Sequence, residues 1–298
     1  RQAQADMARE YGVEAFCYWH YWFGNGRRLL ERPFNEVLES GKPDFPFCLA
    51  WANHSWRGIY NGVKTKESLI DQTYGGLSDY ERHFYDVLPA FEDKRYVTVD
   101  GKPFFLIFAP AEIPDSREFI DCWQRLAARN GLTGIHFVAH TYQPNDIDNF
   151  LSMGYDAVNV VRLFEYQRIG ISFVQKVLNK VNREVFKHGF WCQYKDAMKY
   201  CSGKEDEREN AYPTIIPNWD HSPRTGRYGA ILKDSTPQLF QKHVEQTVHL
   251  ILNKDDDHRI VILKSWNEWA EGNYVEPDLN FGRGYLEALR TALQKDIR

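Results

Sequence analysis

Residues 103–140, PFFLIFAPAEIPDSREFIDCWQRLAARNGLTGIHFVAH, indicate the fold class. The apolar runs 103–109 and 135–140 are short, continuous and rich in aromatic and β-branched residues. Such runs are typical of strands that are buried on both faces of a parallel sheet. Between them, residues 116–130 have the apolar spacing of a helix that ends at Asn130-Gly131. The stretch therefore predicts a strand–helix–strand unit.

The same alternation extends outward from this unit in both directions. Residues 95–99 with Asp100-Gly101 predict a hairpin that enters the strand at 103, because Asp-Gly suits a type I′ turn. The other expected strands are 14–19, 45–51, 156–161, 212–217 and 260–266. The other expected helices are 29–38, 77–91, 146–153, 173–200, 237–253 and 285–296.

Alternating strands and helices predict an α/β fold with a parallel sheet, either closed as a (β/α)₈ TIM-type barrel or open. An open Rossmann sheet should carry a glycine-rich turn after an early strand, and none is present, so the barrel is favoured. The chain opens with a helical pattern that has no strand before it, so we expect the first strand to precede residue 1. We predict a single catalytic barrel domain over 1–298 with a helical insertion at about 171–208.

Composition excludes several classes of protein. Lys plus Arg number 37 and Asp plus Glu 41, so the net charge is 37 − 41 = −4 and nucleic acid is not an expected partner. No apolar run reaches the ~18 residues of a transmembrane helix. Five cysteines without C-x-x-C spacing imply no disulfide framework and favour a reducing compartment, the cytoplasm, with Cys17 and Cys48 expected to be buried. The chain begins without Met, so a signal peptide cannot be read from it.

Aromatic residues make up 15% of the chain, and polar and aromatic residues gather just past the expected strand ends. In a barrel those ends form the catalytic face. Indole and phenol rings stack on sugar rings while polar groups bind hydroxyls, so an oligosaccharide is the expected partner. The candidate substrate-binding residues are Tyr18, His20, Tyr21, Trp22, Trp51, Asn53, His54, Trp56, His140, Tyr142, Arg162, Trp219, Asp220, Arg224, Trp266, Asn267, Trp269, Tyr274 and Glu276.

Glu268 and Glu271 are the leading catalytic pair. Glycosidic bonds are usually broken by two carboxyl groups, and residues three apart on a turn can approach the ~5–5.5 Å of retaining enzymes. We expect repulsion between the two acids to raise one pKa and keep that group protonated. The alternative is an exposed acid pair that favours a helix N-terminus.

Other readings of polar residues compete with this one. His20, His54, His140 and His221 lie near expected strand ends, but no H-x-H or H-E-x-x-H spacing occurs, so neither a metal nor another cofactor is expected. The run 255–257 (Asp-Asp-Asp) precedes a strand and is interpreted as a solvated turn. Arg162 and Arg224 either clamp an anionic substrate or pair with Glu165 and Asp220, and Asp220 is either a further site acid or part of the loop.

Several long motifs make the chain similar to a known family. Residues 264–277, KSWNEWAEGNYVEP, resemble the signature of the WbsX-type proteins, polysaccharide-biosynthesis glycosyltransferases that are related to glycoside hydrolase family 99. The resemblance includes residues 11–23, 30–33, 41–53 and 217–220 followed by Arg224, and so spans nearly the whole chain. The chain departs from the family pattern at His54, where relatives commonly carry a glutamate.

The resemblance implies a (β/α)₈ barrel and a retaining mechanism. The acid that matches Glu268 acts as a base on the sugar 2-hydroxyl, which attacks its own anomeric carbon to give a 1,2-anhydro sugar. The acid that matches Glu271 protonates the departing oxygen and later activates the acceptor.

Three functions remain open at this point. The first is cleavage or transfer of a glycosyl group of a complex glycan. The second is nucleotide-sugar-dependent transfer during assembly of a bacterial surface polysaccharide, lipopolysaccharide O-antigen or capsule. The third is a non-catalytic glycan-binding barrel. The sequence does not indicate the sugar, the linkage or the oligomeric state.

Overall fold

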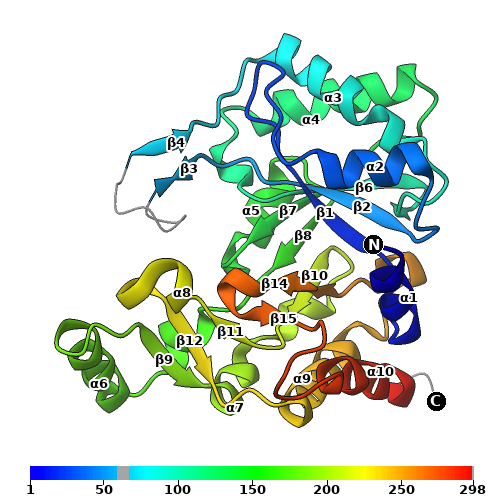
Figure 1. Cartoon of the computed structure of the whole chain (residues 1–298). Helices are drawn as coiled ribbons and strands as arrows, with labels where there is room; N and C mark the ends of the chain where they lie inside the picture. Colours follow the sequence, from blue (N-terminus) through cyan, green and yellow to red (C-terminus); the bar gives the residue numbers. More distant parts are fainter. Residues whose placement is uncertain (59–66, 297–298) are drawn as a thin grey trace. The chain divides into compact units, whose positions relative to one another are not determined.

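The computed structural model describes residues 1–58 and 67–296, and the chain divides into two compact units. The first unit comprises residues 1–56, 68–141 and 145–159, and the second comprises 57–67, 142–144 and 160–298. Figure 1 labels the helices and strands of both units.

The first unit is built on parallel strands separated by helices. Neighbouring strands follow the order β1-β2-β6-β7-β8, with Cys17 opposite Cys48 and Phe105 opposite both Leu49 and Phe137. Its elements are α1 (Gln2–Glu10), β1 (Phe16–His20), α2 (Arg32–Ser40), β2 (Phe47–Trp51), β4 (Ser68–Ile70), α3 (Leu77–Phe91), β5 (Thr98–Val99), β6 (Lys102–Ile107), α4 (Ser116–Arg129), β7 (His136–Thr141) and α5 (Ile147–Ser152). At the boundaries between the units lie β3 (Trp56–Arg57) and β8 (Ala157–Val160).

Aromatic packing between helix and sheet stabilises the first unit. Trp123 of α4 is fully buried, and its ring centroid lies 4.9 Å from those of Phe105 in β6 and Phe119 in α4. Its indole N–H donates to the carbonyl of Tyr80 in α3, which joins the two helices. Burial of such rings contributes several kcal/mol to folding, about 1.5–3 kcal/mol for each large side chain.

The second unit holds two strands of the expected series and a smaller sheet. β10 (Ala211–Ile215) pairs in parallel with β13 (Ile262–Leu263). A separate three-stranded sheet has the order β11-β12-β9, with β11 antiparallel to β12 and β12 parallel to β9. The remaining elements are α6 (Phe173–Glu184), β9 (Phe190–Gln193), α7 (Tyr194–Ala197), β11 (Trp219–Asp220), α8 (Ser222–Thr225), β12 (Ala230–Lys233), α9 (Pro237–Ile251), β14 (Asn267–Glu268), β15 (Asn273–Tyr274) and α10 (Gly284–Asp296).

All seven expected strands are present, and so is the hairpin that leads into β6. Strand β5 pairs antiparallel with β6 through Asp100 and Gly101, which both have positive φ as a type I′ turn requires. The Asp-Asp-Asp run is exposed and precedes β13, as expected of a solvated turn.

Two expectations about local structure are wrong. The segment 171–208 is not wholly helical, because α6 ends at Glu184 and β9 follows, paired with β12. A Cβ on Gly189 would lie 2.3 Å from the Gly229 carbonyl oxygen, so the backbones there approach too closely for any larger residue. Cys48 is buried, but Cys17 is exposed, because burial alternates along β1.

Candidate functional site

The two candidate acids lie on a short hairpin in the second unit. Glu268 ends β14, Glu271 ends a 3₁₀ turn at Trp269–Glu271, and β15 returns with Asn273 opposite Glu268. Gly272 makes the turn possible: its φ is +51°, and a Cβ there would lie 3.0 Å from both Cβ and N of Asp220. The hairpin therefore packs directly against β11.

A buried asparagine anchors the hairpin. Asn273 has no exposed surface, and its amide nitrogen donates to the carbonyls of Asn218 (2.8 Å) and Lys264 (2.9 Å). The Asn218 side chain in turn accepts from the backbone N–H of Tyr274 at 2.9 Å. The Ser265 hydroxyl donates to the Asn273 carbonyl and accepts from the Glu268 N–H. These bonds fix the backbone from which both acids project.

One guanidinium group bridges the two carboxylates. Arg224 of α8 donates from Nη1 to Oε1 of Glu271 at 2.7 Å and from Nη2 to Oε1 of Glu268 at 3.2 Å. His221, just before α8, places Nε2 3.4 Å from the same oxygen of Glu271. The Arg224 and Glu268 side chains are about one-third exposed and Glu271 is less so, so the group is accessible from solvent.

The surrounding charges decide the protonation of Glu271. Burial disfavours its ionised form, but the hydrogen bond from His221 and the charges of Lys264 and Arg224 outweigh burial and lower its pKa. Burial also lowers the pKa of Lys264, against the charges of Glu271 and Glu268. The expectation that repulsion between the acids raises a pKa is therefore wrong for Glu271, because cations dominate its surroundings.

Stacked aromatic rings border the acids. Trp269 and Tyr274 are stacked with centroids 3.8 Å apart, and Trp269 is 47% exposed. The carboxylate of Glu276 accepts from the indole N–H of Trp266 at 2.9 Å and of Trp269 at 3.0 Å. Glu276 thus holds two indoles through their N–H groups.

Six residues expected to bind sugar belong instead to the interior of their own units. His20 shares a 2.8 Å hydrogen bond with His83, and burial lowers its pKa to about 3. The Asn53 side-chain amide donates to the carbonyl of Ala109 at 2.8 Å and accepts from the backbone N–H of the same residue at 2.7 Å. The six buried residues are His20, Trp22, Trp51, Asn53, His140 and Trp219.

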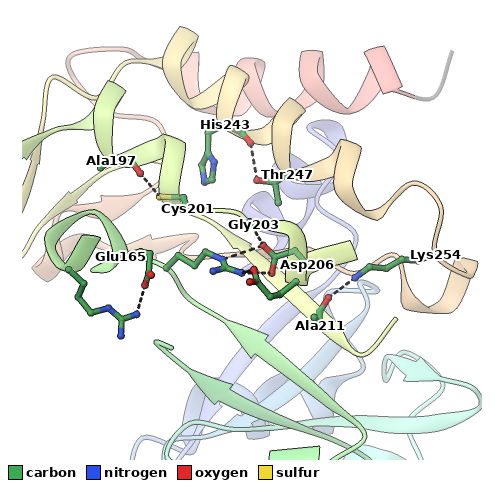
Figure 2. Close-up of polar contacts among 12 residues, drawn as sticks. Glu165, Ala197, Cys201, Gly203, Asp206, Ala211, His243, Thr247 and Lys254 are labelled. Carbon is green, nitrogen blue, oxygen red and sulfur yellow. Dashed lines mark hydrogen bonds and ion pairs between the residues drawn. The ribbon is translucent and has the colours of Figure 1, made fainter. Parts of the chain in front are cut away.

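Arg162 is a further correction. It is 5% exposed and pairs with Glu205 at 2.9 Å and Asp206 at 3.4 Å, not with Glu165, which pairs with Arg168. Figure 2 shows Asp206 in this buried polar cluster, where it accepts from the Gly203 N–H, and shows Lys254 nearby, bound to the carbonyl of Ala211. Arg224 likewise pairs with the candidate acids and not with Asp220, whose Oδ1 accepts from the Ser222 N–H at 2.9 Å and from its hydroxyl at 2.5 Å.

Four candidates of the first unit, Tyr18, Tyr21, His54 and Trp56, keep partial exposure, whereas His140 is buried. His54 and His140 each lie 5.0 Å from the ring of Phe108, and His140 shares a 2.9 Å hydrogen bond with Asn159. Tyr21 packs edge-on against Trp56 at 5.2 Å. Tyr18 packs against Phe34 and Phe47.

The two remaining candidates lie in the second unit. Tyr142 packs on Phe164 at 5.5 Å, and burial with the charge of Glu271 raises its pKa to about 12. Asn267 is exposed on β14.

Sequence reasoning did not select Lys264 or Asn273 as site residues, and it considered His221 only among the histidines near strand ends. Lys264 and Asn273 lie inside the quoted motif 264–277, and His221 directly follows 217–220. Their positions in or next to the family motifs were therefore the sequence feature that could have identified them.

Within the described residues no cluster of three or more His, Cys, Asp or Glu has a metal-binding arrangement. No helix in that part of the chain has the length and apolarity to cross a bilayer.

Known structures share the fold of this chain. The GH99 endo-alpha-mannosidase from Bacteroides thetaiotaomicron superimposes with a TM-score of 0.60 at 12% identity, over 99% of this chain and 78% of that one. A glycoside hydrolase-like protein gives 0.59 at 14% identity, over 97% and 84%. At these identities the likeness establishes the α/β fold of the TIM-barrel type and nothing about activity.

The sequence family is that of glycan-processing enzymes. The family model for Glycosyltransferase WbsX matches residues 1–289, and the chain belongs to this family. It is 29% identical over 296 residues to the uncharacterized protein WxcX of Xanthomonas campestris pv. campestris, covering 98% of this chain. The chain spans 41% of the length of that relative.

Proposed function

We propose that the chain breaks or re-forms a glycosidic bond with Glu268 and Glu271 as the paired carboxyl groups. The observation that carries the proposal is the bridging of both carboxylates by Arg224, at 3.2 and 2.7 Å, on a hairpin bordered by the stacked pair Trp269 and Tyr274. Two acids held together beside aromatic rings suit a retaining reaction. We also propose that residues 1–298 act as one catalytic domain.

The proposed reaction follows the family resemblance. Glu268 takes the proton of the sugar 2-hydroxyl, whose oxygen attacks the anomeric carbon as the bond to the leaving oxygen breaks. Glu271 gives its proton to that oxygen. A water or acceptor hydroxyl then opens the 1,2-anhydro ring, leaving its proton on Glu271, while the 2-oxygen regains a proton from Glu268.

Protonation of Glu271 must be coupled to substrate binding. Its pKa is lowered in the free protein, so it holds a proton poorly until the cations nearby are moved or neutralised. A sugar hydroxyl that replaces Glu271 as the partner of Arg224 would draw the guanidinium away and raise that pKa. Movement of Arg224 on substrate binding would then allow Glu271 to hold the proton that it donates.

Membership in a glycosyltransferase family favours transfer from a nucleotide-sugar as the second candidate. The name of the structural neighbour from Bacteroides suggests α-linked mannose as the sugar to test first. Hydrolysis and transfer differ in whether water or a second sugar hydroxyl opens the intermediate. A nucleotide-sugar donor also differs in its leaving group, which is a nucleoside diphosphate and not a sugar hydroxyl.

The test incubates the chain with α-linked mannose oligosaccharides, with and without nucleotide-sugars, and identifies products by mass spectrometry. Glu268→Gln and Glu271→Gln should each lower turnover about a hundredfold or more, because an amide can neither take nor give the proton. Glu287→Gln, on the exposed side of α10, is the matched control. Unchanged turnover in either site variant contradicts the proposal, and glycan binding without turnover in the unaltered chain indicates a binding protein.

A further inference from the structure

Helix α6 has the reverse of the usual arrangement of apolar and polar residues. Its side chains facing the protein are amides: Asn179 exchanges hydrogen bonds with the backbone of Trp191 in β9, at 3.1 and 3.0 Å. Gln175 reaches the same carbonyl at 3.4 Å, and Asn182 reaches that of Gly189 at 3.5 Å. These residues are spaced i, i+4 and i+7, so one stripe attaches the helix to its own unit.

The next stripe along the helix is apolar and exposed. Val174, Leu178, Val181 and Val185 follow the same i, i+4, i+7, i+11 spacing and are 66%, 51%, 44% and 65% exposed. Phe173 at the first turn and Phe186 beyond the last are 80% and 63% exposed. A globular protein normally turns such a stripe toward its core, so this one requires another partner.

A third stripe is basic. It has the same i, i+4, i+7 spacing as the apolar stripe and consists of Lys176, Lys180 and Arg183. Each lies two positions after an apolar residue, which at 3.6 residues a turn places it on roughly the opposite side of the helix. Lys187 follows just beyond the helix, and its Nζ donates to the carbonyl of Glu184. Among the described residues, Lys176 and Lys180 form no ion pair.

The positive charge is local to this helix. Segment 173–187 holds four cationic side chains and one carboxylate, Glu184, although the whole chain has a net charge of −4. In Figure 1, α6 lies beyond β9 at the edge of the three-stranded sheet of its unit. The partner must therefore offer an apolar layer bounded by negative charge, so that opposite sides of the helix contact the two, over about 18 Å, the length of twelve helical residues.

We propose that α6 is a docking helix for an anionic lipid bilayer, lying in the membrane surface with Val174, Leu178 and Val181 among the acyl chains. Helices that lie in the interface combine an apolar face with Lys and Arg on the other, polar face. Phe173 and Phe186 extend the apolar contact at both ends, and Lys176, Lys180 and Arg183 contact lipid phosphates. This inference does not rest on the proposed glycosyl chemistry.

The test is co-sedimentation of the chain with vesicles of equal parts phosphatidylcholine and phosphatidylglycerol, and with vesicles of phosphatidylcholine alone. The chain should bind the anionic vesicles at least about tenfold more tightly. Leu178→Gln with Val181→Gln, and Lys176→Gln with Lys180→Gln, should each weaken that binding about tenfold or more.

Matched controls alter exposed residues elsewhere. Leu77→Gln with Leu279→Gln removes two exposed leucines, and Lys42→Gln with Lys94→Gln removes two exposed lysines; both pairs should bind vesicles as the unaltered chain does. All the variants should unfold at unchanged temperature, because each altered side chain is exposed.

Three results would overturn the proposal. The first is equal binding to neutral and anionic vesicles, or no binding to either. The second is unchanged binding by both α6 variants. The third is self-association in sedimentation velocity that depends on Leu178 and Val181 without any lipid binding, since the stripe would then bind a second copy of the chain.

Discussion

Two arginines of the second unit each bridge two carboxylates, and the two groups differ in burial. Arg162 is 5% exposed and its partner Asp206 has no exposed surface, while its other partner, Glu205, is 48% exposed. The buried pair is therefore that of Arg162 with Asp206. The side chain of Arg224 is 30% exposed, and its partners Glu268 and Glu271 are 33% and 14% exposed. The charges and distances are similar, so burial is the main difference.

That difference separates a structural group from a site. A buried ion pair has lost its water and is strongly destabilised when one partner is removed. A partly exposed guanidinium can release its carboxylates to an entering ligand, because water and ligand hydroxyls replace the lost contacts. The buried pair of Arg162 with Asp206 and the partly exposed group of Arg224 with Glu268 and Glu271 therefore form a matched pair for mutation.

Removing Arg162 should have the largest effect on stability. Arg162→Leu leaves Asp206 buried without its cation and should lower the free energy of unfolding by about 3 kcal/mol or more, measured by urea denaturation. Arg162→Leu with Asp206→Leu should recover part of the loss. Arg168→Leu breaks a more exposed pair with Glu165 and should cost less than about 1 kcal/mol. Equal costs for the two single variants would contradict the distinction.

Lys254, near the same buried cluster, should make the free energy of unfolding increase with pH in the alkaline range. It is 2% exposed, donates to the carbonyl of Ala211 at 2.5 Å, and burial lowers its pKa from 10.5 to about 8 (Figure 2). Between those values the unfolded chain binds more protons than the folded one, so the free energy of unfolding rises with pH, by about 2–3 kcal/mol from pH 8 to 10.

Lys254→Met isolates that contribution from other titrating groups. The difference in unfolding free energy between the unaltered chain and the variant should grow by the stated amount across this window. A difference that stays constant with pH would show that Lys254 titrates alike in both states.

Arg224→Met should give the smallest effect, a shift in the pH dependence of activity. The charge of Arg224 favours the ionised form of Glu271, so its removal raises the pKa of that carboxyl. Because the proposed first step uses protonated Glu271, activity that is lost above this pKa should persist to higher pH. The measurement is the alkaline limb of the kcat/KM profile.

Arg227→Met, which alters a nearby arginine that contacts Tyr228, is the control and should leave the profile in place. An unmoved alkaline limb in Arg224→Met would remove Arg224 from control of the acid.

The strands were predictable because each is a short apolar run with no alternation. Phe105 and Phe137 lie in such runs and are fully buried, as parallel strands between helices require. Strand β9 was not predictable: Phe190 and Trp191 are too few to form a pattern, and they become a strand through pairing with Ala230 and Ile231. Short strands outside the main sheet depend on partners distant in sequence.

The two candidate acids could be predicted from the sequence, but the residues that surround them could be predicted only in part. The spacing of Glu268 and Glu271 predicted both on one turn, and in the structure Glu268 ends β14 and Glu271 ends the turn that follows, so one hairpin carries both. An aromatic or polar residue after a strand has the same sequence signature whether it faces a ligand or the core, so Trp51 and Asn53 were assigned to sugar binding although both are buried.

By itself the sequence determined the alternation of strands and helices and the turn that carries the acids, because both depend on residues close together in the chain. Only the tertiary structure decided which arginine lies beside which carboxylates and that Glu271 is surrounded by cations. Those contacts join residues some 40 to 50 positions apart. Electrostatic energies depend on distance and burial, which residue order alone does not specify.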